Sequence, residues 1–152
     1  MLTAEQIDEQ FKQFLIYLKE CVGDNSARMK AVTQLIKDYE DAILSAPASS
    51  RTQFHSAWPG GWLFHTNKVV AIAKDTLKMW SDHGAHIDFG VNELVFAALF
   101  HDLGKLGWPN IPLYDEQNSD WHFKQGEVYS INAECKYLPT SERSIFILQQ
   151  IS

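Results

Sequence analysis

The stretch "LFHDLGKLG", residues 99–107, places an imidazole and a carboxylate side by side at the end of an apolar run. Residues 94–100 are apolar without a break, so a helix built on "NELVFAALFHDLGK" is apolar on all sides and is expected at the centre of the fold. Burying unpaired polar or charged groups costs roughly 2–7 kcal/mol or more. His101 and Asp102 therefore need a partner inside the protein.

Two amphipathic helices are predicted in the first third of the chain. Thr3 and Gln6 have the spacing of a capping box, and apolar residues then recur at helical spacing from Ile7 until Gly23. A second helical pattern begins near Ser26 and ends at "SAPASS", residues 45–50. We expect these two helices to pack as a pair.

A third helix is predicted from about Trp62 to Trp80, after the loop "SSRTQFHSAWPGG". We expect Asn92 to cap the central helix that follows it. The third helix has one face that we expect to point inward, formed by His65, Val69, Ile72, Thr76 and Trp80.

The segment from Gly107 to about Leu138 is rich in Pro, Asn, Asp and aromatic residues and has no sustained periodicity. This composition predicts a long ordered loop or a short hairpin, and long loops in compact domains often carry function. "TSERSIFILQQIS" then opens another amphipathic helix with Ser141 as its expected cap, and the sequence ends inside that helix. The patterns predict one all-α domain over residues 1–152, either complete or truncated at its C-terminal end.

Composition limits the classes of partner. With 45% hydrophobic residues the chain can bury a sizeable core, and its formal net charge of −6 argues against a broad nucleic-acid-binding surface. The two cysteines, Cys21 and Cys135, do not have the spacing of a zinc ribbon or a disulfide framework. No apolar run approaches the roughly 18 residues of a membrane span. We therefore expect a soluble cytoplasmic protein.

A bound cation is the partner that best explains the buried polar pair. His65 and His101 lie on separate predicted helices of the same core, so two imidazoles and the carboxylate of Asp102 are able to converge. A mixed His and carboxylate set suits Mn, Fe, Co, Ni or Zn, and Mg²⁺ is also compatible. The alternative is an ordinary core histidine that is hydrogen-bonded to a backbone carbonyl.

These residues resemble the H…HD pattern of the HD-domain metal-dependent phosphohydrolases, which are all-helical enzymes that cleave phosphate esters. His65, the sequence "HDLGK" at residues 101–105 and the upstream stretch "FHSAWPGGWLFH" carry the resemblance, which covers roughly residues 51–148. "FHSAWPGGWLFH" is similar to the segment that leads into the first ligand histidine of several stand-alone bacterial and phage HD proteins. The resemblance implies an HD-like helical bundle with a long ordered loop or short hairpin after the HD helix.

The resemblance also implies roles for individual residues. His65, His101 and Asp102 would be metal ligands, Asp102 would also orient the attacking water, and Lys105 would lie near the substrate phosphate. The metal would polarise a phosphoryl oxygen and lower the pKa of a bound water. The acidic net charge favours a small nucleotide as the substrate. Three residues of the flanking loops are candidate phosphate contacts: Arg51, His55 and His122.

This chain departs from the family pattern at its end. The family has a further Asp on a later helix, and the sequence stops without a clear equivalent. Two ligand sets remain open: a truncated form with three protein ligands, or a site that a loop carboxylate completes. Two other functions also remain open. The first is a degenerate HD module that binds a nucleotide or a protein without turnover, and the second is an HD-type nuclease, against which the acidic charge argues. The loop offers four carboxylates as the missing ligand: Asp115, Asp120, Glu127 and Glu134.

Overall fold

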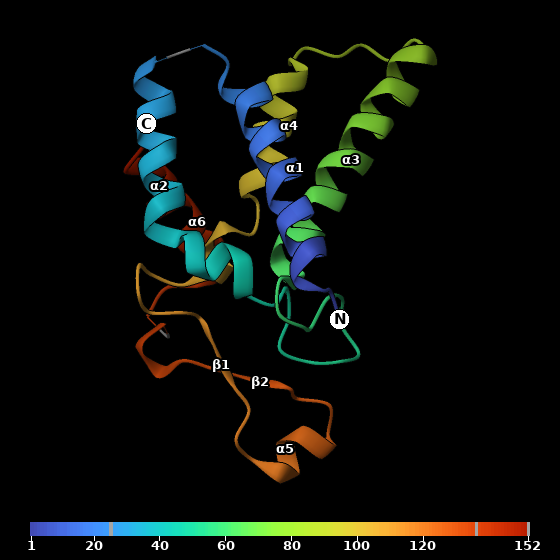
Figure 1. Cartoon of the computed structure of the whole chain (residues 1–152). Coiled ribbons are helices and arrows are strands. Elements are labelled where there is room, and N and C mark those ends of the chain that lie inside the picture. The colour runs from blue at the N-terminus through green and yellow to red at the C-terminus, as the bar shows by residue number, and fades with distance from the viewer. Residues whose placement is uncertain (25, 136, 152) are drawn as a thin grey trace.

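The computed structural model describes residues 1–24, 26–135 and 137–151, which fold mostly into helices. Figure 1 shows the longer helices gathered in one body, with a small two-stranded hairpin that carries a short helix extending below them. No helix in the described part of the chain is long and apolar enough to cross a membrane. The helices are α1 (Ala4–Val22), α2 (Ser26–Ser45), α3 (Gly61–Asp82), α4 (Val91–Phe100), α5 (Asp120–Lys124) and α6 (Thr140–Gln149), with 3-10 turns η1 (Leu103–Leu106) and η2 (Ala133–Cys135) and strands β1 (Tyr114–Glu116) and β2 (Tyr129–Ile131).

The first helices form as their local signals predict. The side chain of Thr3 accepts a hydrogen bond from the Gln6 amide, the Gln6 side chain accepts one from the Thr3 amide, and α1 ends at Gly23. These reciprocal bonds satisfy amides that the helix itself leaves unpaired. The N-terminus of α1 is therefore where the capping box placed it.

The apolar helix α4 packs into the core along one face, as its composition predicts in part, while Ala97 on its other face is exposed. It packs against α1 and α3, and Val95 and Leu99 have no exposed surface. Helix α2 packs against α1 and α3, while α6 packs against η1, the turn that follows α4. The end of α4 and the turn η1 after it therefore lie close to α1, α3 and α6.

The segment after η1 forms a hairpin, which confirms the second form predicted for it. β1 and β2 are antiparallel, with Tyr114 opposite Ile131 and Glu116 opposite Tyr129. Between them lies α5, a short helix that the sequence patterns did not predict. Backbone amides of the hairpin also reach the loop before α3, since Val128 donates to Ser50 O.

Two predicted helix caps are wrong. α4 begins at Val91 with Gly90 as its N-cap, because the Glu93 carboxylate accepts a hydrogen bond from the Gly90 amide at 2.7 Å and extends the helix before Asn92. α6 begins at Thr140 after Pro139, so Ser141 is inside the helix. α6 also ends at Gln149, and Ser152 of the predicted helix lies outside the described residues.

The predicted inward face of α3 is also wrong over the second half of the helix. Ile72 and Trp80 are each 55% exposed, whereas Trp62, Leu63 and Val70 have no exposed surface. The buried stripe is therefore rotated from the predicted one. In Figure 1 the C-terminal end of α3 extends away from α4, and the exposed Trp80 lies on this end.

Candidate metal centre

Three predicted ligands meet where the start of α3 faces the end of α4. His65 lies in the second turn of α3, and His101 and Asp102 follow directly after α4. The Nε2 atoms of His65 and His101 are 3.3 Å apart, and Asp102 Oδ2 is 3.7 Å from the first and 3.3 Å from the second. Residues that are 36 positions apart in the sequence thus form one compact group.

Backbone contacts orient the two residues of the HD pair. His101 Nδ1 lies 2.8 Å from Ala98 O. Because a carbonyl only accepts, Nδ1 carries the proton, and neutral His101 presents the Nε2 lone pair to the group. The indole Nε1 of the fully buried Trp62 donates to Asp102 O at 2.9 Å and holds the backbone of that residue.

The spacing of the three atoms fits a first-row divalent metal ion. A point equidistant from the two Nε2 atoms and Asp102 Oδ2 lies about 2 Å from each of them, which is close to Zn–N and Zn–O bond lengths of about 2.0–2.2 Å. Two imidazoles and one carboxylate are also a common donor set for catalytic transition metals, with further positions left open. The residues present therefore fit the metal that the HD resemblance implies.

The protonation of two of the three groups, His65 and Asp102, also suits metal binding. Burial lowers the pKa of His65 to about 4, with a further contribution from His55, so this imidazole is neutral at pH 7. Burial opposes ionisation of Asp102, but hydrogen bonds from His101 and Lys105 outweigh it and hold the pKa of Asp102 well below its usual range. The hydrogen bond to Asp102 in turn raises the pKa of His101, so a metal that binds at Nε2 of this residue must displace the proton there. A neutral imidazole and an ionised carboxylate are the forms that coordinate metal.

Lys105 is the cation nearest to the carboxylate in this part of the described chain. Its Nζ lies 2.7 Å from Asp102 Oδ2 and donates to Ala48 O at 2.9 Å. A carboxylate offers about four lone-pair positions, so Asp102 is able to serve Lys105 and a metal together. Lys105 also links the turn of residues 101–105, called here the metal-ligand turn because it carries two of the three predicted ligands, to the loop before α3.

That loop brings His55 to the edge of the group. The ring of His55 stacks on the ring of His65, with centroids 4.2 Å apart and planes 30° apart, and its side chain is exposed. The loop turns sharply into α3 because Gly60 has a φ of 76° and a Cβ on Gly61 would lie 2.0 Å from Ser56 O. The "PGG" sequence therefore brings the loop that carries His55 close to the start of α3.

The other two predicted substrate contacts lie elsewhere. Arg51 forms an ion pair and a backbone bridge with Glu127, which joins the loop before α3 to the hairpin. His122 is on α5, where its Nδ1 is 2.8 Å from Ser119 Oγ and its ring packs edge-on against Trp121. Figure 1 shows α5 at the tip of the hairpin, away from α3 and α4.

Loop carboxylates do not complete the ligand set in the described residues. The metal-type group there consists of His65, His101 and Asp102, and Glu127 is paired with Arg51 instead. Of the two arrangements that the sequence left open, the one with three protein ligands agrees with this geometry. Asp115 lies in β1, Asp120 in α5 and Glu134 in η2, and all three are exposed.

Sequence reasoning missed two residues next to the group. Trp62 supports the Asp102 backbone, and its position three residues before His65 on the same helix was an available signal. Tyr114 opens β1, and burial together with the negative charge of Asp102 raises its pKa, so its phenol stays protonated and able to donate a hydrogen bond. No local pattern indicated Tyr114, since its position depends on the path of the hairpin.

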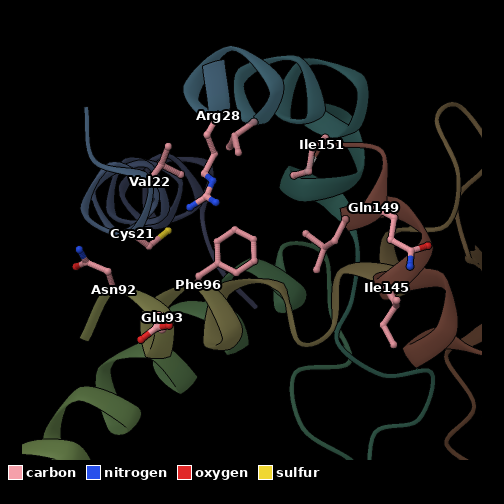
Figure 2. Close-up of a pocket in the computed structure, with 11 residues that line it drawn as sticks. Cys21, Val22, Arg28, Asn92, Glu93, Phe96, Ile145, Gln149 and Ile151 are labelled. Carbon is pink, nitrogen blue, oxygen red and sulfur yellow. The ribbon is translucent and has the colours of Figure 1, made fainter. Parts of the chain in front are cut away.

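A separate cavity of about 730 Å³ lies at the opposite end of α4. Figure 2 shows its lining, with Cys21 and Val22 from α1, Arg28 from α2, and Phe96 from α4. None of the three metal-type ligands lines this cavity. Its walls are mainly apolar, so it differs in character from the group around Asp102.

Comparison of the chain with models of protein families, with curated proteins and with solved structures found no match. The resemblance to HD-domain enzymes therefore depends on the quoted residues and on the geometry of His65, His101 and Asp102.

Proposed function

We propose that this chain is an HD-type metal-dependent phosphohydrolase that cleaves a phosphate ester of a small nucleotide. The observation that carries the proposal is the meeting of two imidazole Nε2 atoms and one carboxylate oxygen within 3.7 Å of one another, at the sequence "HDLGK". Partly exposed side chains form the group, since His65 and Asp102 are 20% and 18% exposed. A ligand from solution is therefore able to reach it.

His65, His101 and Asp102 would hold the divalent ion, with Mn, Fe, Co, Ni or Zn as candidates. When bound, such an ion polarises a phosphoryl oxygen and makes water a better nucleophile at neutral pH. Three protein ligands leave positions open for substrate and water, as in catalytic rather than structural sites. Asp102 would also accept a hydrogen bond from the attacking water and orient it toward phosphorus.

Lys105 and His55 would contact the phosphate. An ammonium group has three N–H donors, and Asp102 and Ala48 use two of those on Lys105, which leaves one for a phosphoryl oxygen. A fixed cation beside the reacting phosphate stabilises the negative charge that develops in the transition state. His55 is exposed and stacks on His65, which places a second imidazole, open to solution, beside the group.

A small nucleotide fits the charge of the chain better than a nucleic acid does. Binding to a polynucleotide backbone needs several clustered Lys and Arg residues, whereas the formal net charge here is −6. One mononucleotide needs only the metal and one or two cationic groups. The nuclease alternative therefore has less support.

The experiment is elemental analysis of the purified chain, together with a nucleotide hydrolysis screen in Mn²⁺, Co²⁺, Ni²⁺, Zn²⁺ and Mg²⁺. The test variant combines His101→Ala with Asp102→Ala, and the matched control combines His86→Ala with Asp88→Ala in an exposed loop. We expect metal and turnover in the wild type and the control and neither in the test variant. Equal, negligible metal in all three would reject the site.

A non-catalytic binding module is the second candidate, and the contact between Lys105 and Asp102 favours it. This ion pair neutralises the half-buried carboxylate of Asp102 without any metal. If the wild type binds metal and nucleotide but shows no turnover above the Asp102→Ala background, the binding module replaces the enzyme.

A further inference from the structure

Helix α6 buries a cation against the metal-ligand turn. Arg143 is 1% exposed, and its guanidinium donates to the carbonyls of Gly104, Cys135 and Leu138. Its Cζ also lies 5.5 Å from the centre of the Trp108 ring. In the described ranges no carboxylate lies within ion-pairing distance of Arg143.

The next residue on α6, Ser144, also binds Gly104, through the other backbone group of that glycine. Ser144 Oγ accepts a hydrogen bond from the Gly104 amide at 2.7 Å and donates to Thr140 O at 3.0 Å. Arg143 Nη1 donates to Gly104 O at 2.6 Å. Two consecutive residues of α6 thus hold both the amide and the carbonyl of Gly104.

Gly104 lies between the two charged residues of the site. Asp102 is two residues before it and Lys105 is the next residue, so the Gly104 backbone sets where both side chains begin. A Cβ on Gly104 would be 2.0 Å from Thr140 O, which means that the backbones of the turn and of α6 are in direct contact. Any shift of α6 is therefore transmitted to Asp102 and Lys105.

The chemistry of Arg143 points the same way. Burying a guanidinium without a carboxylate is costly, and a large apolar side chain would fill the space at lower desolvation cost. What an apolar side chain lacks is a planar fork of donors that reaches three carbonyls at once. The guanidinium therefore contributes precise placement of the backbone it binds.

We propose that Arg143 and Ser144 are positioning residues of the metal centre, which act by fixing the turn Asp102–Lys105 through Gly104. The inference depends on the proposed metal site for its functional meaning. Groups that orient metal ligands without touching the metal commonly change metal affinity about 10–100-fold when they are lost. Arg143 and Ser144 do not contact the ligand side chains, and they act through the Gly104 backbone, which follows the ligand Asp102 by two residues.

The test compares Ser144→Ala and Arg143→Lys with two controls in the full chain. Ser141→Ala makes the same change as Ser144→Ala at an exposed position of α6. Val32→Ala removes methyl groups from a fully buried residue of α2 and serves as a control for loss of stability alone. Each variant is titrated with Zn²⁺ and with Co²⁺, and hydrogen exchange of the Gly104 amide and the Trp62 indole is followed by NMR without metal.

We expect Ser144→Ala and Arg143→Lys to raise the Kd for Zn²⁺ about tenfold or more. Exchange of the Gly104 amide should become at least about tenfold faster, because it loses its acceptor or the turn opens more often. Ser141→Ala should match the wild type in both measurements. Val32→Ala should lower the melting temperature and leave the Kd unchanged.

Two results would overturn the inference. One is a wild-type Kd in both test variants, and the other is an equal loss of affinity in Val32→Ala. If the wild type itself binds no metal, the proposed function fails, and hydrogen exchange then decides the inference alone. Faster exchange confined to residues 101–105 would support a positioning role, whereas unchanged exchange or acceleration across the whole chain would refute it.

Discussion

Replacing Gly104 with alanine should destabilise the chain strongly, although the backbone angle at Gly104 is an ordinary one. The new Cβ would lie 2.0 Å from Thr140 O, 2.9 Å from Thr140 C and 3.0 Å from Ser144 N. Non-bonded heavy atoms are most stable at roughly 3.5–4.0 Å, so α6 or the turn must move by about 1 Å or more. The clash involves backbone atoms, which no rotamer change relieves.

The cost has two parts. Forcing extra volume into a well-packed core costs about 1–3 kcal/mol. The movement also weakens the bonds from the Gly104 amide to Ser144 and from Arg143 to the Gly104 carbonyl, and each buried group left unpaired costs about 1–3 kcal/mol. A loss of about 3–5 kcal/mol in the free energy of unfolding follows, against a typical total of about 5–15 kcal/mol.

Urea unfolding followed by circular dichroism measures this loss, with Gly90→Ala as the matched control. Gly90 has a φ of −86°, and a Cβ there would meet its nearest neighbour, Glu93 Oε2, at 3.6 Å, an ordinary contact. We expect the control to lose less than about 1 kcal/mol and Gly104→Ala to lower the melting temperature by about 10 °C or more. A loss below about 1 kcal/mol for Gly104→Ala would refute the close contact between η1 and α6.

Three further outcomes test other parts of the structure. Burial raises the pKa of Cys21 from 9.0 to about 11, so iodoacetamide at about pH 8 should label this thiol only after unfolding, and rapid labelling of the native chain would contradict its burial. The stability that the neutral thiol contributes is present below pH 9 and is lost as the pH rises to 11. A double-mutant cycle on Arg51 and Glu127 should give a coupling below about 1 kcal/mol, because the Arg51 side chain is 44% exposed, and a coupling above about 2 kcal/mol would be inconsistent with that exposure. Trp62→Phe should cost about 1–2 kcal/mol in urea unfolding, because Asp102 O loses its indole donor, and an unchanged stability would show that this bond is dispensable.

The sequence by itself determined the helices whose signals are local. The capping box at Thr3 and the apolar residues at helical spacing specify α1, because capping and periodicity depend on residues within one or two turns. The unbroken apolar run before His101 predicted burial of α4 on all sides, and the structure buries one face of it, with Val95 and Leu99 in the core and Ala97 exposed. Because His65 and the pair His101 and Asp102 lie on predicted helices of the same core, the sequence also indicated that these three side chains could lie close together.

Local signals failed where a contact from elsewhere outweighed them. Asn is a preferred residue at helix N-caps, which is why Asn92 was expected to cap α4. The helix begins earlier because the Glu93 carboxylate accepts a hydrogen bond from the Gly90 amide. On α3, the helical period was right and the direction of the buried face was wrong, because periodicity states that a face exists and leaves open which neighbour covers it.

Only the tertiary structure decided which polar residues surround Asp102. Lys105 bonds to Ala48 across 57 positions of sequence, and Arg51 pairs with Glu127 across 76, distances over which no sequence pattern specifies a partner. Arg143 reads as a surface residue of an amphipathic helix, yet it is buried because the carbonyls of Gly104, Cys135 and Leu138 converge on it only after the chain has folded. The sequence indicated which residue types make up the candidate metal centre, whereas the contacts that hold them in place depend on long-range packing.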